Sequence, residues 1–162
     1  MLRAINVARY FLFLDTNGQT FRAELVSRNG KTFSEGNARL NKYLHIAQNL
    51  YIAQTGNKLF SDDLYAFDNG AVVPAVREKY TLLCRTTKAK PEIPDAYIMF
   101  LNKIYKVLMN ASLDELIEIS HEDSEWQARN PQRDNQRMNS LAHVDEYSRQ
   151  YADMLKIMDR MV

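Results

Sequence analysis

A long segment with helical spacing, residues 35–55, constrains the fold more than any other feature. Its pattern is carried by Leu40, Tyr43, Leu44, Ala47, Leu50, Tyr51 and Gln54. Steps of three and four residues place such side chains on one face of an α-helix. Gly56 follows where a helix end favours glycine. We therefore predict a helix here, with Leu44, Ala47, Leu50 and Tyr51 as its central buried stripe.

Other segments have the same spacing and predict helices at residues 4–15, 74–80, 95–110, 112–120 and 144–161. Pro74 suits the first turn of a helix, and Ser112 with Glu115 forms a capping box. Over residues 95–110 the pattern is carried by Ala96, Met99, Phe100, Lys103, Ile104, Val107 and Leu108. The final helix is expected to use Tyr147, Tyr151, Leu155 and Met158. The segment 121–137 is polar and turn-rich.

Short strands are predicted in two places. Residues 20–26 and 31–33 flank Asn29-Gly30, a dipeptide typical of hairpin turns. Residues 64–67 resemble a strand and lead into a turn at 68–70. The predicted fold class is mostly α: a compact single-domain helical bundle, residues 1–162, with one or two short β-hairpin or strand pieces.

Composition excludes several functional classes. The 162 residues have a formal net charge of +1, and a bulk electrostatic grip on nucleic acid normally needs a clear basic excess. Cys84 is the single cysteine, so an intramolecular disulfide and a thiolate zinc cage are both excluded. The chain has no apolar run of signal-peptide type and none of the roughly 20 residues that span a bilayer. We expect a cytoplasmic protein without cofactor or membrane contact.

The densest chemical cluster is His121-Glu122-Asp123 with Trp126. An imidazole and two carboxylates suit a divalent metal or acid–base chemistry. Three adjacent residues do not all face one point on a helix, however, and His45 and His143 lack zincin spacing. The competing interpretation is structural: His121 and Glu122 cap neighbouring helices, with Trp126 packed beneath them.

Other groups carry weaker hypotheses. Tyrosines such as Tyr65, Tyr97 and Tyr147 are core residues or, where exposed, anchors for a protein partner. A loop with Arg85, Lys88 and Lys90 is a solvated surface or, as a minority hypothesis, a nucleic-acid contact. Cys84 beside Arg85 is best interpreted as a small apolar residue at a helix end.

Several pieces of the sequence occur in an order that resembles a known family. They are VARYFL (7–12), RLNKYLHIAQ (39–48), LYIA (50–53), GNKLF (56–60), DDLYAF (62–67), NGAVVPAV (69–76) and a segment over 116–126 that ends in HEDSEW. Their order and spacing resemble the Panacea domain, the SocA-like antitoxin domain also found in phage-associated GepA-like proteins. The resemblance spans residues 4–126. The chain departs from the family pattern at Phe67 (usually tryptophan), Ala71 (proline) and Glu125 (proline), and segment 19–37 is longer than usual.

The resemblance implies a bacterial or phage-encoded antitoxin that neutralises a cognate toxin by direct contact, with no enzymatic activity. One relative is thought to deliver its toxin to an AAA+ protease. Motifs in polar turns more often serve binding or loop geometry than core filling. We therefore expect the turn at 69–70 and the segment 121–126 to form one surface. The candidate partner-binding residues are Asn69, Gly70, Val73, His121, Glu122 and Trp126.

Two other classes of function stay open at this point. One is a metal-dependent hydrolase built on His121, Glu122 and Asp123. The other is a regulator that contacts nucleic acid, although no helix-turn-helix with a basic recognition helix supports it. The expected assembly state is a monomer or homodimer.

Overall fold

The structure is a computed structural model that describes residues 1–22, 25–28, 30–130 and 135–161. Its elements are α1 (Ala4–Leu14), β1 (Leu25–Arg28), β2 (Lys31–Ser34), α2 (Glu35–Thr55), β3 (Tyr65–Phe67), β4 (Gly70–Val72), α3 (Pro74–Thr86), α4 (Asp95–Leu108), α5 (Leu113–His121), α6 (Ser124–Arg129), the 3-10 helix η2 (Ser140–His143), α7 (Val144–Gln150) and α8 (Ala152–Asp159). The predicted class, mostly α with short hairpins, is confirmed.

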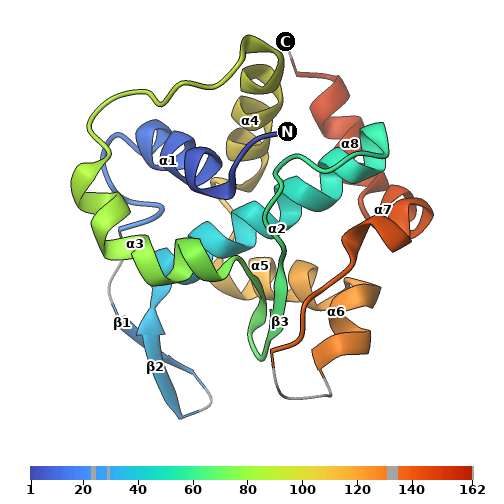
Figure 1. The fold of residues 1–162 in the computed structure, drawn as a ribbon, viewed down its shortest axis with the longest axis horizontal. Coiled ribbons are helices and arrows are strands. Elements are labelled where there is room, and N and C mark those ends of the chain that lie inside the picture. The colour runs from blue at the N-terminus through green and yellow to red at the C-terminus, as the bar shows by residue number, and fades with distance from the viewer. Residues whose placement is uncertain (23–24, 29, 131–134, 162) are drawn as a thin grey trace.

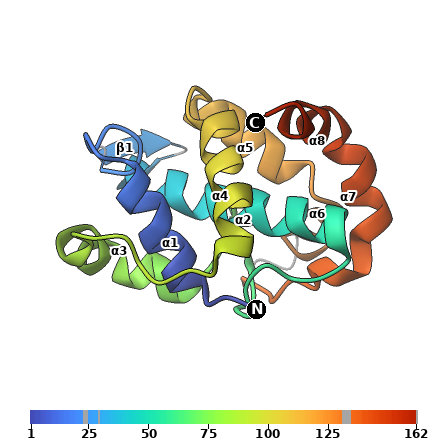
Figure 2. The same ribbon diagram turned by 90° about the horizontal axis from the view of Figure 1, so that it is seen from above.

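Helix α2 is the centre of the fold (Figure 1) and contacts α1, α3, α4, α5, α7 and both hairpins. In the view from above, α4 crosses over it (Figure 2). The predicted helix at 35–55 is confirmed to the residue. Ser34 caps its start by accepting a hydrogen bond from the Asn37 amide, and Gly56 ends it in the left-handed region with φ 74°.

The predicted stripe of α2 is confirmed for Leu44, Ala47 and Leu50, which are fully buried, whereas Tyr51 is only partly buried. The helix is also buried on its polar side. Asn41, Lys42, His45, Gln48 and Asn49 are all at most 2% exposed. This follows from the central position of α2, since elements pack around almost its whole circumference.

The two hairpins are both antiparallel and two-stranded. In the first, Val26 pairs with Phe33, and the hairpin projects from the body of the molecule (Figure 1). Its strand begins at Leu25, not at residue 20, because Phe21 lies in the core against Phe11 and Tyr43. Residues 23, 24 and 29 lie outside the described part. The second hairpin adds a strand, β4, that the sequence did not predict.

The predicted apolar stripe of α4 is confirmed only in part. Ile104 and Leu108 are buried as predicted, but Leu101 is buried in addition, and Met99, a predicted member of the stripe, is 64% exposed. Apolar residues surround this helix on several sides, so spacing alone does not fix which face is covered. Contacts with α2 and α8 decide it.

The C-terminal part differs from the sequence pattern in two places. The polar, turn-rich segment 121–137 contains a helix, α6, and Asp123 caps its N-terminus by accepting a hydrogen bond from the Glu125 amide. The single helix predicted over 144–161 is two helices, α7 and α8. They meet at Tyr151, where φ −101° and ψ 15° break the helix while the tyrosine ring stays buried.

The remaining boundaries agree closely except for the end of α3, which was predicted at residue 80. The capping box of Ser112 and Glu115 forms in both directions, as predicted. Helix α3 runs on to Thr86 because Leu83 packs into the core. Among the helices of the described residues, none is both long and apolar enough to cross a membrane.

Candidate functional site

The turn between β3 and β4 lies against the junction of α5 and α6. The indole Nε1 of Trp126 donates a hydrogen bond to the Phe67 carbonyl oxygen at 2.8 Å. The His121 ring stacks on the same indole, with centroids 4.1 Å apart and planes within 6°. The expected proximity of the turn and segment 121–126 is therefore confirmed.

The six candidate residues divide into an outer and an inner group. Glu122 is exposed, and Asn69 and His121 are half-buried. Gly70, Val73 and Trp126 are buried, and the Val73 amide donates to Asn41 Oδ1 at 3.0 Å. The outer group presents side-chain atoms at the surface, whereas the inner group holds the turn against α2 and α6.

Beneath this surface Asp123 is fully buried and accepts hydrogen bonds on both carboxylate oxygens. His45 Nε2 lies 2.6 Å and Asn49 Nδ2 3.0 Å from Oδ2, while Tyr147 donates to Oδ1 at 2.8 Å. Burial raises the pKa of Asp123, but the bond and charge of His45, with the bonds from Asn49 and Tyr147, lower it to about 2. The carboxylate thus stays ionised and joins α2, α6 and α7.

The same network extends to β4 through Ser120. Its Oγ lies 3.0 Å from His45 Nδ1 and accepts the Ala71 amide at 3.4 Å. Ser120, His45 and Asp123 are therefore connected in the order of a serine-hydrolase triad. A Cβ added at Gly70 would stand only 2.4 Å from Oγ, so β4 covers the hydroxyl. Ser120 is fully buried, and its hydroxyl links β4 to α2.

The hypothesised metal trio does not converge. Asp123 points into the core, Glu122 is exposed, and His121 stacks on the indole. Across the described residues, no three His, Cys, Asp or Glu side chains gather as a metal ion requires. Burial and the charge of Lys42 lower the pKa of His121, against a smaller opposing effect of the Asn69 and Asp68 backbone.

The comparison with protein families agrees with this geometry. A family model described as "Antitoxin SocA-like, Panacea domain" matches residues 40–127. The chain belongs to this antitoxin family. A search of curated proteins and a search of solved structures each found no match. The matched range contains all six candidate residues and His45, Asn49, Ser120 and Asp123 of the buried network beneath them, whereas Tyr147 lies outside it.

Two departures of this Panacea domain from the family pattern have visible consequences. Glu125 is buried. Its Oε2 accepts hydrogen bonds from the Asn139 amide at 2.6 Å and from Arg129 Nε at 3.0 Å. Its Oε1 lies 2.9 Å from His143 Nε2. The Ala71 amide, which a proline lacks, supplies the bond to Ser120. Both residues therefore tie the site to its surroundings through contacts that proline would not make.

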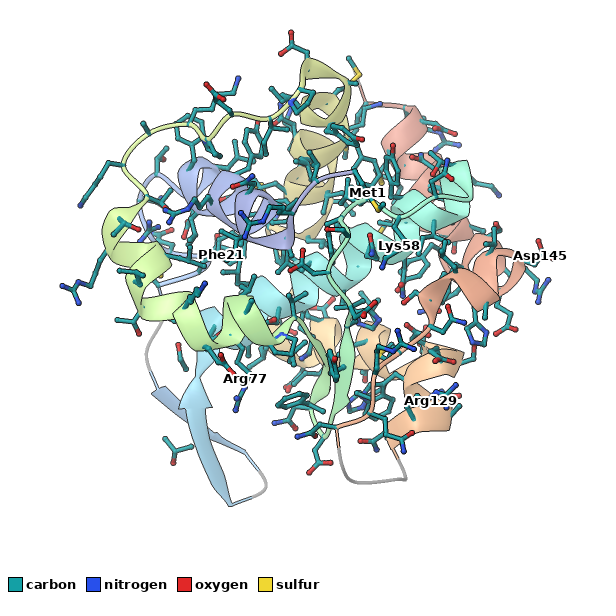
Figure 3. All side chains as sticks on the ribbon, viewed as in Figure 1. Met1, Phe21, Lys58, Arg77, Arg129 and Asp145 are labelled. Atoms are coloured by element: carbon teal, nitrogen blue, oxygen red, sulfur yellow. The ribbon has the colours of Figure 1, made fainter. Side chains whose placement is uncertain are left out.

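The outer rim of the Panacea site carries two arginines on opposite sides of the second hairpin, Arg77 on α3 and Arg129 on α6 (Figure 3). Arg77 lies over the Phe67 ring, 5.0 Å from its centroid. The phenylalanine that replaces the usual tryptophan therefore still takes part in a packed contact.

Other candidates lie outside the site. Tyr147 is fully buried, so its hypothesised role as an exposed anchor is wrong; Tyr65 and Tyr97 are half-buried. Burial raises the pKa of the Cys84 thiol, which argues against a reactive thiolate. Arg85, Lys88 and Lys90 are exposed at the end of α3 and on the loop that follows it.

No motif in the sequence singled out the residues of α2 that support the Panacea site: Lys42, His45 and Asn49. One signal for them was present. They are three and four residues apart, so they share one face of the helix. A polar face that includes a lysine can therefore indicate a buried polar network when its helix is central, and not only a face in contact with solvent.

Proposed function

We propose that this protein is an antitoxin that neutralises a cognate toxin by direct contact. The proposed contact surface is formed by Asn69, His121 and Glu122, with Gly70, Val73 and Trp126 holding it in shape. Membership of the SocA-like antitoxin family supports a toxin as the partner. The proposal treats the protein as a binding module and not as an enzyme.

The observation that carries the surface proposal is the contact of two segments about 50 residues apart, which the Trp126–Phe67 hydrogen bond and the His121–Trp126 stack lock together. A preorganised surface loses less conformational entropy when it binds, and this favours affinity. Its exposed groups are polar, and a buried aromatic ring supports them from below. These features suit recognition of a folded protein partner.

A growth assay tests the function. The chain and the product of the gene beside it are co-expressed, and rescue from toxicity and co-purification are scored together. Glu122→Lys reverses one exposed charge on the proposed surface. We expect it to lower affinity at least tenfold without changing the melting temperature, since surface substitutions usually alter stability by only about 0.5 kcal/mol.

Glu92→Lys is the matched control, because it makes the same charge change on the exposed loop before α4. Equal affinities for both variants and the unchanged protein would reject the surface. An absence of rescue and of complex with the unchanged chain would reject the antitoxin assignment for that gene pair. Rescue that disappears in cells lacking an AAA+ protease would identify an adaptor, whereas rescue in such cells would identify a simple neutraliser.

A further inference from the structure

His143 connects the C-terminal helices to the matched Panacea domain through both of its ring nitrogens. Its Nε2 lies 2.9 Å from Oε1 of Glu125 on α6, and its Nδ1 lies 3.1 Å from Oε2 of Glu146 on α7. His143 itself ends η2 and precedes the first residue of α7. Both η2 and α7 lie outside the matched range, whereas Glu125 lies within it. These three side chains form the His143 joint between the domain and the rest of the chain.

The geometry of the His143 joint requires a charged histidine. Both partner atoms are carboxylate oxygens, and an ionised carboxylate only accepts hydrogen bonds. Each ring nitrogen must therefore donate a proton, and only the imidazolium form has a proton on both nitrogens. Burial lowers the pKa of His143, but the hydrogen bonds to Glu125 and Glu146 and the charges of these two residues raise it above its ordinary value.

The groups around the joint keep both carboxylates ionised. Burial raises the pKa of Glu125, but bonds from the Asn139 amide, His143 and Arg129 lower it. Bonds from Ser124 and His143 lower the pKa of Glu146. The titratable side chains on the surrounding elements are Glu125 and Arg129 on α6, Asp145, Glu146, Tyr147 and Arg149 on α7, and His45 on α2, which pairs with Asp123.

Loss of one proton from His143 leaves the joint one donor short. Glu125 is only 3% exposed, so an unpaired oxygen on it would be costly. Glu146 is exposed, and its carboxylate can replace a lost hydrogen bond with one from water. The remaining ring proton therefore stays on Nε2, which faces Glu125. Nδ1 then becomes an acceptor that faces the oxygen of Glu146.

The Ser124 hydroxyl is placed to respond to this change. Its Oγ donates a hydrogen bond to Glu146 Oε2 and lies 3.3 Å from His143 Nδ1. A hydroxyl has one proton, so it donates to only one of these two atoms at a time. When Nδ1 becomes an acceptor, the hydroxyl can rotate toward it. Glu146 then loses the bonds from both His143 and Ser124.

We propose that the His143 joint is a proton-operated switch, which holds Glu146 while His143 is charged and releases it when His143 loses a proton. One proton passes from Nδ1 to water, while the hydroxyl proton stays on Ser124 and changes its acceptor from Glu146 to His143. Histidine is the side chain that changes charge near neutral pH, so modest changes of pH operate the switch. The inference does not depend on the proposed antitoxin function.

NMR of the full chain with ¹⁵N-labelled histidine tests the protonation step. The shifts of the two ring nitrogens give the pKa of each histidine and the tautomer of its neutral form. We expect His143 to titrate above the ordinary value of 6.5 and its neutral form to keep the proton on Nε2. A pKa at or below 6.5, or a neutral form with the proton on Nδ1, would overturn the inference.

Two matched variants test whether Glu146 is the group that responds. Glu146→Gln removes the carboxylate of the joint, and Asp145→Asn removes the same charge from the neighbouring exposed position of α7. Both side chains are exposed, so neither change should unfold the protein. We expect Glu146→Gln to lower the pKa of His143 clearly more than Asp145→Asn does. Equal shifts in the two variants would show only a general effect of charge and would reject the switch.

The release itself is measured on the unchanged protein through the side chain of Glu146. Below the midpoint of the His143 titration, the χ1 couplings of Glu146 should correspond to one rotamer. Above that midpoint they should average over several rotamers, with the same midpoint as the ring nitrogens of His143. Couplings that stay constant through the titration would contradict the release of Glu146. No toxin is present in these measurements, so their outcome is separate from that of the growth assay.

Discussion

Replacing Lys42 by methionine should stabilise the folded protein. Burial lowers the pKa of Lys42 from 10.5 to about 8. One pKa unit corresponds to 1.36 kcal/mol, so the buried charge costs about 3 kcal/mol at neutral pH. Methionine has a similar length and no charge. We expect Lys42→Met to gain about 2–3 kcal/mol, or about 4–12 °C in melting temperature for a chain of this size.

The free energy of unfolding gained by Lys42→Met should decrease as the pH rises. The folded pKa of Lys42 lies below the unfolded one, so the unfolded chain binds more protons between about pH 8 and 10.5. The charge of Lys42 therefore destabilises the folded protein fully below about pH 8, and this destabilisation disappears as the pH rises toward 10.5. The difference between Lys42→Met and the unchanged protein should shrink over this interval.

Urea unfolding followed by circular dichroism at pH 7 and pH 10 measures both effects. Lys79→Met serves as the control and should change the free energy of unfolding by less than about 0.5 kcal/mol at either pH. A destabilised Lys42→Met, or a gain that stays equal at both pH values, would refute the reasoning. The ammonium would then have a counter-charge or full hydration in the folded protein.

Three further substitutions test the core and the buried network. Leu50→Ala, at a fully buried position of α2, should cost about 2–5 kcal/mol in urea unfolding, and a loss under about 0.5 kcal/mol would mean that this helix face is solvated. Asp123→Asn removes the carboxylate that His45 pairs with and should cost about 3–5 kcal/mol. The pKa of Asp123 is about 2 in the folded protein, compared with an ordinary value of 3.8. The ionised carboxylate therefore stabilises the folded protein above about pH 4, and this stabilisation is lost as the pH falls toward 2. The acid-unfolding curve of Asp123→Asn should lack this pH-dependent loss. Gly70→Ala should lower the melting temperature, since φ is 127° and the new Cβ would stand 2.4 Å from Ser120 Oγ; an unchanged melting temperature would show that β4 shifts without cost.

The sequence predicted best where local rules act without competition. The helix at 35–55, its glycine end and the capping box of Ser112 depend on residues only a few positions apart. Predictions from the sequence failed where the local spacing allows more than one structure and tertiary contacts select one of them. The buried face of α4, the break at Tyr151 and the start of α6 all depend on which neighbouring element covers a side chain.

The candidate site shows the same division. Motifs in the sequence singled out Asn69, Gly70, His121 and Trp126, and the structure brings their two segments together. The support from α2 was not predicted. His45 and Asn49 are 78 and 74 residues away from Asp123 in the sequence, and no local pattern links them. Lys42 is likewise separated from Gly70 of β4 by the rest of α2 and a long connection.

By itself the sequence determined which segments are helical and which family the chain resembles, because helical spacing, caps and motif order are properties of neighbouring residues. Only the tertiary structure decided that the polar face of α2 is buried, that Asp123 pairs inward with His45, and that Lys42 lies beneath the second hairpin. The physical reason is that burial is a property of the assembled elements. A polar side chain has the same local spacing whether water or another helix covers it.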